Sequence, residues 1–221
     1  MLTPPFTREQ FFDVFRAYNE ALWPAAVALW LGAMAVAVTH WRGRGDHRTF
    51  GALALLWAWS AIAYHAAYFT RINPAAWLFA SLFLVEAALL AHEALVARRL
   101  RFASRGTIWS RAGWILLAYA LAYPALASVG HVTRWHAPTF GVPCPTTLFT
   151  AGVLLLTTSG SWRLSIIPVL WSLIGGTAAV LWHVRADLVL PIAGFVLTTF
   201  SLATHATDLD ASARSTRPRG M

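Results

Sequence analysis

The sequence predicts an all-α integral membrane protein, a bundle of seven transmembrane helices preceded by a short amphipathic helix at the membrane interface. Of the 221 residues, 58% are hydrophobic and only 12% are charged, whereas a soluble domain carries about a quarter charged residues. The 12 tryptophans are typical of the aromatic belts that line membrane–water interfaces. Apolar segments of the length that a membrane-spanning helix needs, roughly 17–25 residues, follow one another along the chain.

The interfacial helix is expected in residues 1–20. Thr7 and Gln10 have the spacing of a capping box, in which each side chain bonds the backbone N–H of the other residue. One side of the following turns is aromatic, with Phe11, Phe12, Phe15 and Tyr18. Such a helix lies in the interface, and the chain is expected to turn inward at Trp23-Pro24. No cleavable signal peptide is apparent, because no basic head precedes an apolar stretch.

The membrane domain is expected to cover residues 21–205. Its predicted spans are residues 21–40, 50–69, 74–97, 112–130, 144–160, 164–183 and 188–205. The fifth is short and is followed by the polar run "TTSGS". If it does not cross, six spans remain and the C-terminus changes sides. Residues 206–221 are polar and rich in small side chains, which predicts a disordered tail.

The arginines predict the orientation. All 17 basic residues are arginine, and with seven spans 12 of them fall on one side and five on the other. Because positive charge is enriched in cytoplasmic loops, we expect the N-terminus outside and the C-terminus inside. Short arginine-bearing loops between apolar segments do not indicate nucleic-acid binding. The absence of lysine excludes retinal, and the single cysteine excludes an intrachain disulfide and any paired-cysteine metal motif.

Candidate chemistry is concentrated at the outer ends of the spans. The candidate pocket residues there are Tyr18, Asn19, Ser60, Tyr64, His65, Asn73, His131, Cys144, Thr146, Thr147 and Asp187. Solvation alone would scatter polar side chains over both ends of a bundle. Their clustering at one end therefore predicts an outward-facing polar pocket.

Cys144 lies between two prolines, in "FGVPCPTTLF". Pro145 suits the first position of a helix, so we place Cys144 at the N-cap, where the helix dipole favours a thiolate. Thr146 and Thr147 would add hydroxyl groups at the same place. The alternative is a small buried thiol that only packs against its neighbours.

Two ionisable residues are expected inside the membrane, where such groups face the bundle interior or a watery cavity. His65 lies in the outer third of the second span, beside a helical stripe that includes Ser60 and Tyr64. Glu86 is the only acid in the middle of a span, which suits proton relay, cation binding or metal ligation. The alternatives are a neutral imidazole and a protonated acid that only satisfy neighbouring helices.

Two further residues have both a structural and a functional interpretation. Asn73 is expected to cap the third span, and Asp187 to cap the last one or to act as an acid ligand. His65, His131 and Cys144 could converge on a transition metal such as zinc or copper, with Asp187 nearby.

The segments "YNEALWP", "YHAAYFTRINPAAWLF", "YPALASVGH" and "FGVPCPTTLFTAGVLLL" resemble those of a bacterial family of multi-pass membrane proteins classified only as a domain of unknown function. The resemblance covers about residues 5–205 and implies the architecture, but no activity. The pattern of seven-span metal hydrolases is broken, because Ser60 and His65 have the wrong spacing and the last span offers only His205.

Three functions remain open. The first is an inner-membrane protein that binds or transports a metal ion or a small polar solute in the outward pocket, with Glu86 beneath it. The second is an intramembrane enzyme in which a metal-bound water or the Cys144 thiolate attacks a lipid or a small molecule. The third is an accessory membrane subunit whose polar residues only satisfy one another.

Overall fold

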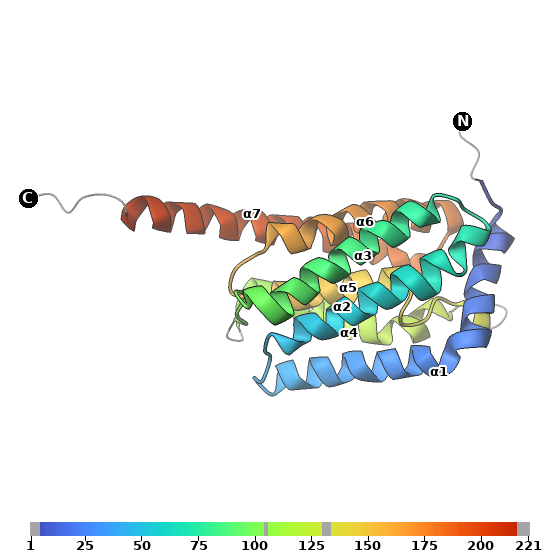
Figure 1. The fold of residues 1–221 in the computed structure, drawn as a ribbon, viewed down its shortest axis with the longest axis horizontal. Helices are drawn as coiled ribbons and strands as arrows, with labels where there is room; N and C mark the ends of the chain where they lie inside the picture. Colours follow the sequence, from blue (N-terminus) through green and yellow to red (C-terminus); the bar gives the residue numbers. More distant parts are fainter. Residues whose placement is uncertain (1–4, 104–105, 130–133, 216–221) are drawn as a thin grey trace, which may run out of the picture.

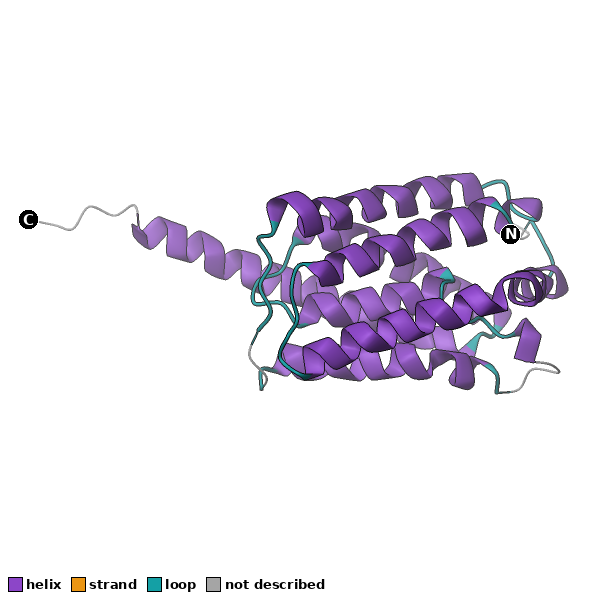
Figure 2. Ribbon diagram, turned by 60° about the horizontal axis from the view of Figure 1, so that its bottom comes forward, coloured by secondary structure: helices purple, strands orange, loops and turns teal. Residues whose placement is uncertain are grey.

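The computed structural model describes residues 5–103, 106–129 and 134–215, and within these ranges it has seven α-helices and no strands (Figures 1 and 2). The all-α prediction is therefore confirmed, and each predicted span overlaps one α-helix. The helices are α1 (Arg8–Trp41), α2 (Arg48–Trp59), α3 (Ala76–His92), α4 (Ile108–Ala127), α5 (Pro143–Leu155), α6 (Trp162–Trp182) and α7 (Val189–Ser215). Five segments of the described chain are long and apolar enough to cross a membrane, and these are Arg8–Trp41, Arg48–Arg71, Ala76–Ala97, Trp162–Trp182 and Arg185–Ala206.

Consecutive helices run in opposite directions, so the connections gather at two ends of the bundle (Figure 1). The α2–α3, α4–α5 and α6–α7 connections form one end, which we call the Cys144 end. The α1–α2, α3–α4 and α5–α6 connections form the other, which we call the Arg101 end. The Cys144 end is the one that the arginine distribution predicts to face outward.

The first part of α1 runs across the Cys144 end before the helix turns to lie along the bundle (Figure 1). The predicted capping box is present, because Gln10 N bonds Thr7 Oγ1 and Thr7 N bonds Gln10 Oε1. The expected aromatic side is buried at Phe11, Phe12, Phe15 and Tyr18. A single helix thus replaces the predicted interfacial helix and separate first span. We attribute its turn to Pro24, which lies inside α1 and removes one helical hydrogen bond.

Two helices end in wider π-helical turns. The chain of α2 continues as a π-helix over Ser60–Ala66, and that of α3 over Glu93–Ala97. Such turns are rare and occur frequently at functional sites. The segment Ser60–Ala66 carries three of the candidate residues, Ser60, Tyr64 and His65.

The short helix α5 lies at the centre of the bundle. Its 13 residues span ~20 Å at 1.5 Å per residue, less than the ~30 Å hydrocarbon core of a bilayer. Every residue of α5 except Cys144 is buried. Its closest approach to α4 is at two glycines, since a Cβ on Gly113 would lie 2.7 Å from the carbonyl oxygen of Gly152. Neighbouring helices therefore surround α5 instead of lipid.

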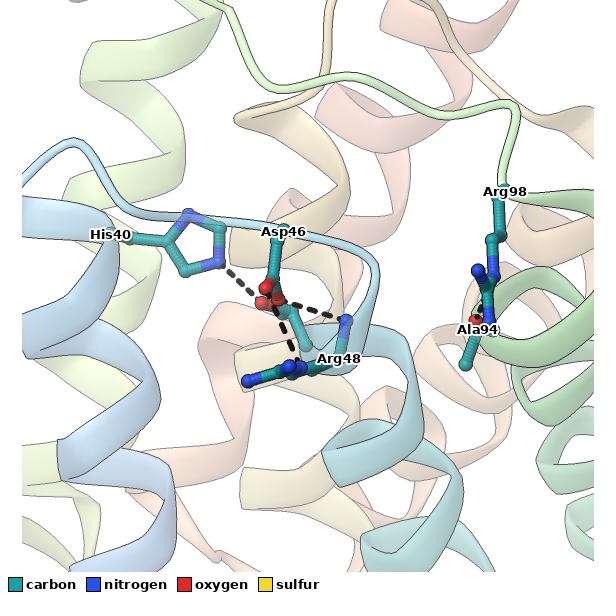
Figure 3. Close-up of polar contacts among 6 residues, drawn as sticks. His40, Asp46, Arg48, Ala94 and Arg98 are labelled. Carbon is teal, nitrogen blue, oxygen red and sulfur yellow. Dashed lines mark hydrogen bonds and ion pairs between the residues drawn. The ribbon is translucent and has the colours of Figure 1, made fainter.

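The Arg101 end is closed by loops that carry polar and aromatic contacts. His40 Nε2 lies 2.9 Å from Thr49 Oγ1, and Asp46 Oδ1 accepts from the backbone N–H of Arg48 (Figure 3). The His40 ring packs edge-on against Phe102, with ring centres 4.2 Å apart. A pocket of about 670 Å³ lies here, lined among others by His40, Arg101 and Trp114. The sequence indicated arginines at this end but no such cavity.

The helix α7 continues to Ser215 and projects beyond the other helices (Figures 1 and 2). The sequence predicted a disordered tail from residue 206. The chain is instead helical through 215, and residues 216–221 lie outside the described part.

Candidate functional site

A cavity of about 490 Å³ opens at the Cys144 end between the start of α1, the α2–α3 connection and helices α3 and α6. Its aromatic walls are Phe6, Phe11, Tyr64, Phe69, Phe79, Trp171 and Trp182. Its polar lining residues are Asn73, Cys144, Thr177 and Asp187. We call this cavity the aromatic pocket. The predicted polar pocket therefore has a largely apolar wall and few polar groups, as is common for pockets that bind small organic molecules.

A polar cluster at the pocket draws its side chains from four elements. The Cys144 thiol, at the start of α5, interacts with the Asp187 carboxyl group from the 3₁₀ turn Arg185–Leu188. Asp187 Oδ1 accepts a hydrogen bond from the Tyr123 hydroxyl of α4. The indole of Trp171 in α6 lies next to the same thiol, although its Nε1–H has no hydrogen-bond partner among the described residues. The chain's only cysteine is thus part of a polar cluster rather than an isolated thiol.

A glycine leaves space beside this cluster. A Cβ on Gly175 would lie 3.5 Å from Trp171 Nε1 and 3.7 Å from Cys144 Sγ. It would also lie 2.8 Å from Leu190 Cδ1, too close for an unstrained contact. The small residue at 175 therefore lets α6 approach the start of α7 while the thiol and the indole stay next to the cavity.

Cys144 does not occupy the predicted N-cap. The helix α5 starts at Pro143 with Val142 as its N-cap, so Cys144 is the second helical residue. Both prolines fit the first turn, because the N–H groups that they lack have no acceptor within the helix there. Gly141 precedes them with φ +91°, a conformation that favours glycine. The sequence "GVPCP" thus turns the chain sharply and starts the helix two residues earlier than expected.

His65 lies behind the wall of the pocket. Its side chain is fully buried, and neither ring nitrogen has a hydrogen-bond partner among the described residues. The imidazole centre lies 4.8 Å from the ring centre of Phe83 and 5.1 Å from that of Trp171. The ring therefore sits in an aromatic cage that shares Trp171 with the pocket.

Other candidate residues are buried without partners in the described ranges. Both carboxyl oxygens of Glu86, Ser60 Oγ and Thr146 Oγ1 have none. Glu86 lies one helical turn from Phe83 on the buried side of α3. Orphan polar groups of this kind are few in native proteins, and each calls for an explanation.

Three candidates instead have structural contacts. The Tyr18 hydroxyl accepts from Trp59 Nε1 at 2.7 Å, and the Thr147 hydroxyl donates to the Pro143 carbonyl at 2.9 Å. Asn19 binds the α4–α5 connection: its Nδ2 donates to the carbonyl oxygens of Trp135 and Ala137, and its Oδ1 accepts from Thr139. None of the three lines the aromatic pocket.

Asn73 combines both roles. Its Oδ1 accepts from the backbone N–H of Ala75 at 3.1 Å, while the N-cap of α3 is Ala75 itself. Asn73 therefore stabilises the turn before α3 instead of capping the helix as predicted. Its side chain also lines the aromatic pocket.

One member of the predicted metal set of His65, His131 and Cys144 lies outside the described residues. His131 lies outside them, and the ring contacts of His65 are with aromatic side chains. His136 Nε2 lies 3.6 Å from Asp13 Oδ1. Within the ranges that the structure describes, no group of three or more His, Cys, Asp or Glu residues could hold a metal ion.

A comparison with known protein families identifies the family of this chain. A model described as a family of unknown function (DUF6064) matches residues 8–211. The chain belongs to this family. No curated protein and no solved structure matches the chain.

In this DUF6064 chain, sequence reasoning missed Tyr123, Trp171 and Trp182. Every predicted span contains aromatic residues, and their type alone does not distinguish one that faces the interior from one that faces outward. The one usable signal is the pair Gly175-Gly176 after Trp171, because small residues mark close helix packing in membrane proteins.

Proposed function

We propose that this protein is a seven-span protein of the bacterial inner membrane, with its N-terminus outside and its C-terminus in the cytoplasm. It binds a small solute from the outer side in the aromatic pocket and moves it across the bilayer. The observation that carries the proposal is the convergence of Cys144, Asp187 and Trp171, from three separate elements, on one cavity at the Cys144 end.

Large apolar side chains on the bundle surface support insertion in a membrane. Leu55 on α2 is 71% exposed and Phe195 on α7 is 73% exposed. The same holds for α4, which is not one of the five spans by length and hydropathy, since Ile115 is 69% exposed. Lipid would cover these side chains, whereas water would leave contiguous apolar surface exposed.

The short helix α5 supports an odd number of crossings. Its first turn carries Cys144 beside Asp187, at the end where α6 joins α7. Beyond its last turn, the Leu156 carbonyl oxygen accepts from the backbone N–H of Ala103, and the backbone N–H of Thr158 donates to the Arg101 carbonyl oxygen. The chain of α5 therefore connects the two ends of the bundle although the helix itself is short.

Buried polar groups support a path inward from the pocket. The buried imidazole of His65 contacts Trp171, which also lines the pocket. It also contacts Phe83, which lies one helical turn before Glu86 in α3. Ionisable residues inside a membrane mark ion or proton pathways more often than structural positions. Glu86 thus supplies the acid for a charge-compensating or proton-coupled step.

Because Cys144 is the only cysteine of the chain, thiol labelling tests whether the pocket is accessible from outside. In spheroplasts, a membrane-impermeant maleimide should label Cys144, and Cys144→Ser should abolish the signal. In the Cys144→Ser background, Arg44→Cys places an exposed thiol at the Arg101 end, which should react only after permeabilisation. A Cys144 that resists the reagent until the membrane is permeabilised would contradict the outward-facing pocket.

Movement of solute needs a flux assay in proteoliposomes. Cys144→Ala and Glu86→Gln should each lower the flux that the wild type mediates, the first through the pocket and the second through the buried acid. Unchanged flux in both variants would remove the transport part of the proposal and leave a binding protein.

The thiol's surroundings support binding more than nucleophilic catalysis. Asp187 and Cys144 would place two like charges side by side if both ionised, which is unfavourable in a buried site. No described imidazole contacts the thiol to serve as its base. Metal analysis of the purified protein, beside Cys144→Ala, tests the remaining metal-dependent possibility.

A further inference from the structure

The aromatic pocket contains one formally charged lining residue. Asp187 is 3% exposed and, among the described residues, makes no ion pair. Its contacts with Tyr123 and Cys144 involve hydroxyl and thiol groups, which carry no positive charge. A buried carboxylate is strongly disfavoured unless an opposite charge or metal accompanies it.

The walls around Asp187 are suited to a positive charge. Tyr64, Phe79 and Trp171 present ring systems to the same cavity, and the faces of aromatic rings attract cations within about 6 Å of the ring centre. Trp171 also contacts Phe79, with ring centres 5.4 Å apart and planes 78° from parallel. Rings at such different angles form walls on more than one side of a bound group.

Two arginines of the same end line a different cavity. Arg8 and Arg185, with His183, border a neighbouring pocket of about 260 Å³. The Arg8 Nε–H donates to the Trp182 carbonyl oxygen at 3.2 Å. Of these two pockets, one is lined by Arg8 and Arg185, whereas Asp187 is the formally charged residue that lines the aromatic pocket.

We infer that the aromatic pocket binds an organic cation, an amine or a quaternary ammonium whose charge lies among the aromatic rings with Asp187 as its counter-charge. The inference rests on the proposed outward-facing solute pocket and names the class of its ligand. The cavity volume of about 490 Å³ falls in the range of ~300–1,000 Å³ that holds small organic molecules.

The test uses Cys144 as a reporter in the purified full-length protein. Benzyltrimethylammonium and choline are the cationic probes. The neutral analogue of choline, 3,3-dimethyl-1-butanol, keeps its shape without the charge, and benzoate reverses the charge. We expect benzyltrimethylammonium to slow maleimide labelling of Cys144 in a saturable way. Asp187→Asn should weaken this protection about ten-fold or more, as expected for loss of a desolvated charge partner.

Matched variants keep the test decisive if Asp187→Asn folds poorly. Asp46→Asn removes an exposed acid at the Arg101 end and should change nothing. Trp171→Leu should weaken protection by the cations, whereas Trp171→Phe, which keeps an aromatic face, should retain most of it. Size-exclusion profiles check the fold of each variant.

The outcomes separate the two proposals. Equal protection by the neutral alcohol or by benzoate, or cation protection that survives both Asp187→Asn and Trp171→Leu, would overturn the cation assignment while the solute pocket stands. A Cys144 that no probe protects and that no external reagent reaches would overturn the pocket itself.

Discussion

The Tyr123–Asp187 hydrogen bond is the contact on which the polar cluster depends. Tyr123 is fully buried, and its hydroxyl donates to Asp187 Oδ1. Tyr123→Phe should lower the free energy of unfolding by about 1–3 kcal/mol, because a buried carboxyl group loses one of its hydrogen-bond donors. Tyr119→Phe, one turn away, removes a partly buried bond to the Ala186 carbonyl and should cost less. Chemical denaturation in detergent compares the two; equal losses would mean that Tyr123 has no special role.

Two glutamates of the α3 segment should respond in opposite directions. Glu86→Leu removes a buried carboxyl group without partners in the described ranges, so we expect it to stabilise the fold by about 1–3 kcal/mol. Glu93→Leu removes Oε1, which accepts from Arg99 N at 2.6 Å and Leu100 N at 2.8 Å, and should destabilise it. The same Glu86 variant should lose flux. A destabilised Glu86→Leu would show that the acid is structural.

Residue type and spacing predicted part of the site. Cys144, Asp187, Tyr64 and Asn73 do share one pocket, because loop position and helix register determine which end of the bundle a residue reaches. The sequence therefore predicts near which end of the bundle a residue lies, but it does not predict the direction in which its side chain points around the helix axis. Asn19 was therefore expected at the pocket, although it instead binds the α4–α5 connection.

At the scale of elements, the contact of α4 with α5 depends on two glycines. A Cβ on Gly152 would lie 3.0 Å from the Gly113 carbonyl oxygen, and one on Gly113 would lie 2.7 Å from that of Gly152. Gly113→Ala should therefore destabilise the bundle by about 1–3 kcal/mol through overpacking. Gly32→Ala on α1 has no atom within 4 Å of the new Cβ and should be neutral or mildly stabilising. Similar thermal midpoints for both variants would contradict the close crossing.

Hydropathy predicted the number and place of the helices but not their roles. The hydropathy of an apolar segment is the same whether lipid or protein surrounds it. The sequence therefore did not predict that α5 is the buried centre of the bundle. The sequence did not reveal the π-helical turn over Ser60–Ala66 either, since an extra residue in a turn leaves no compositional trace. The sequence predicted a turn at Trp23-Pro24, and α1 contains Pro24 without ending there.

For the whole molecule, the decisive property is which end faces outward. The Arg101 end carries most of the arginines, including Arg42, Arg44 and Arg98, and the Cys144 end carries the aromatic pocket. If positive charge sets the orientation, an odd number of crossings leaves the C-terminus at the Arg101 end, inside the cell. A green fluorescent protein fused after residue 221 should then fluoresce, and alkaline phosphatase at the same position should be inactive. The reverse pattern would place the pocket in the cytoplasm, and solutes would have to reach Asp187 from inside.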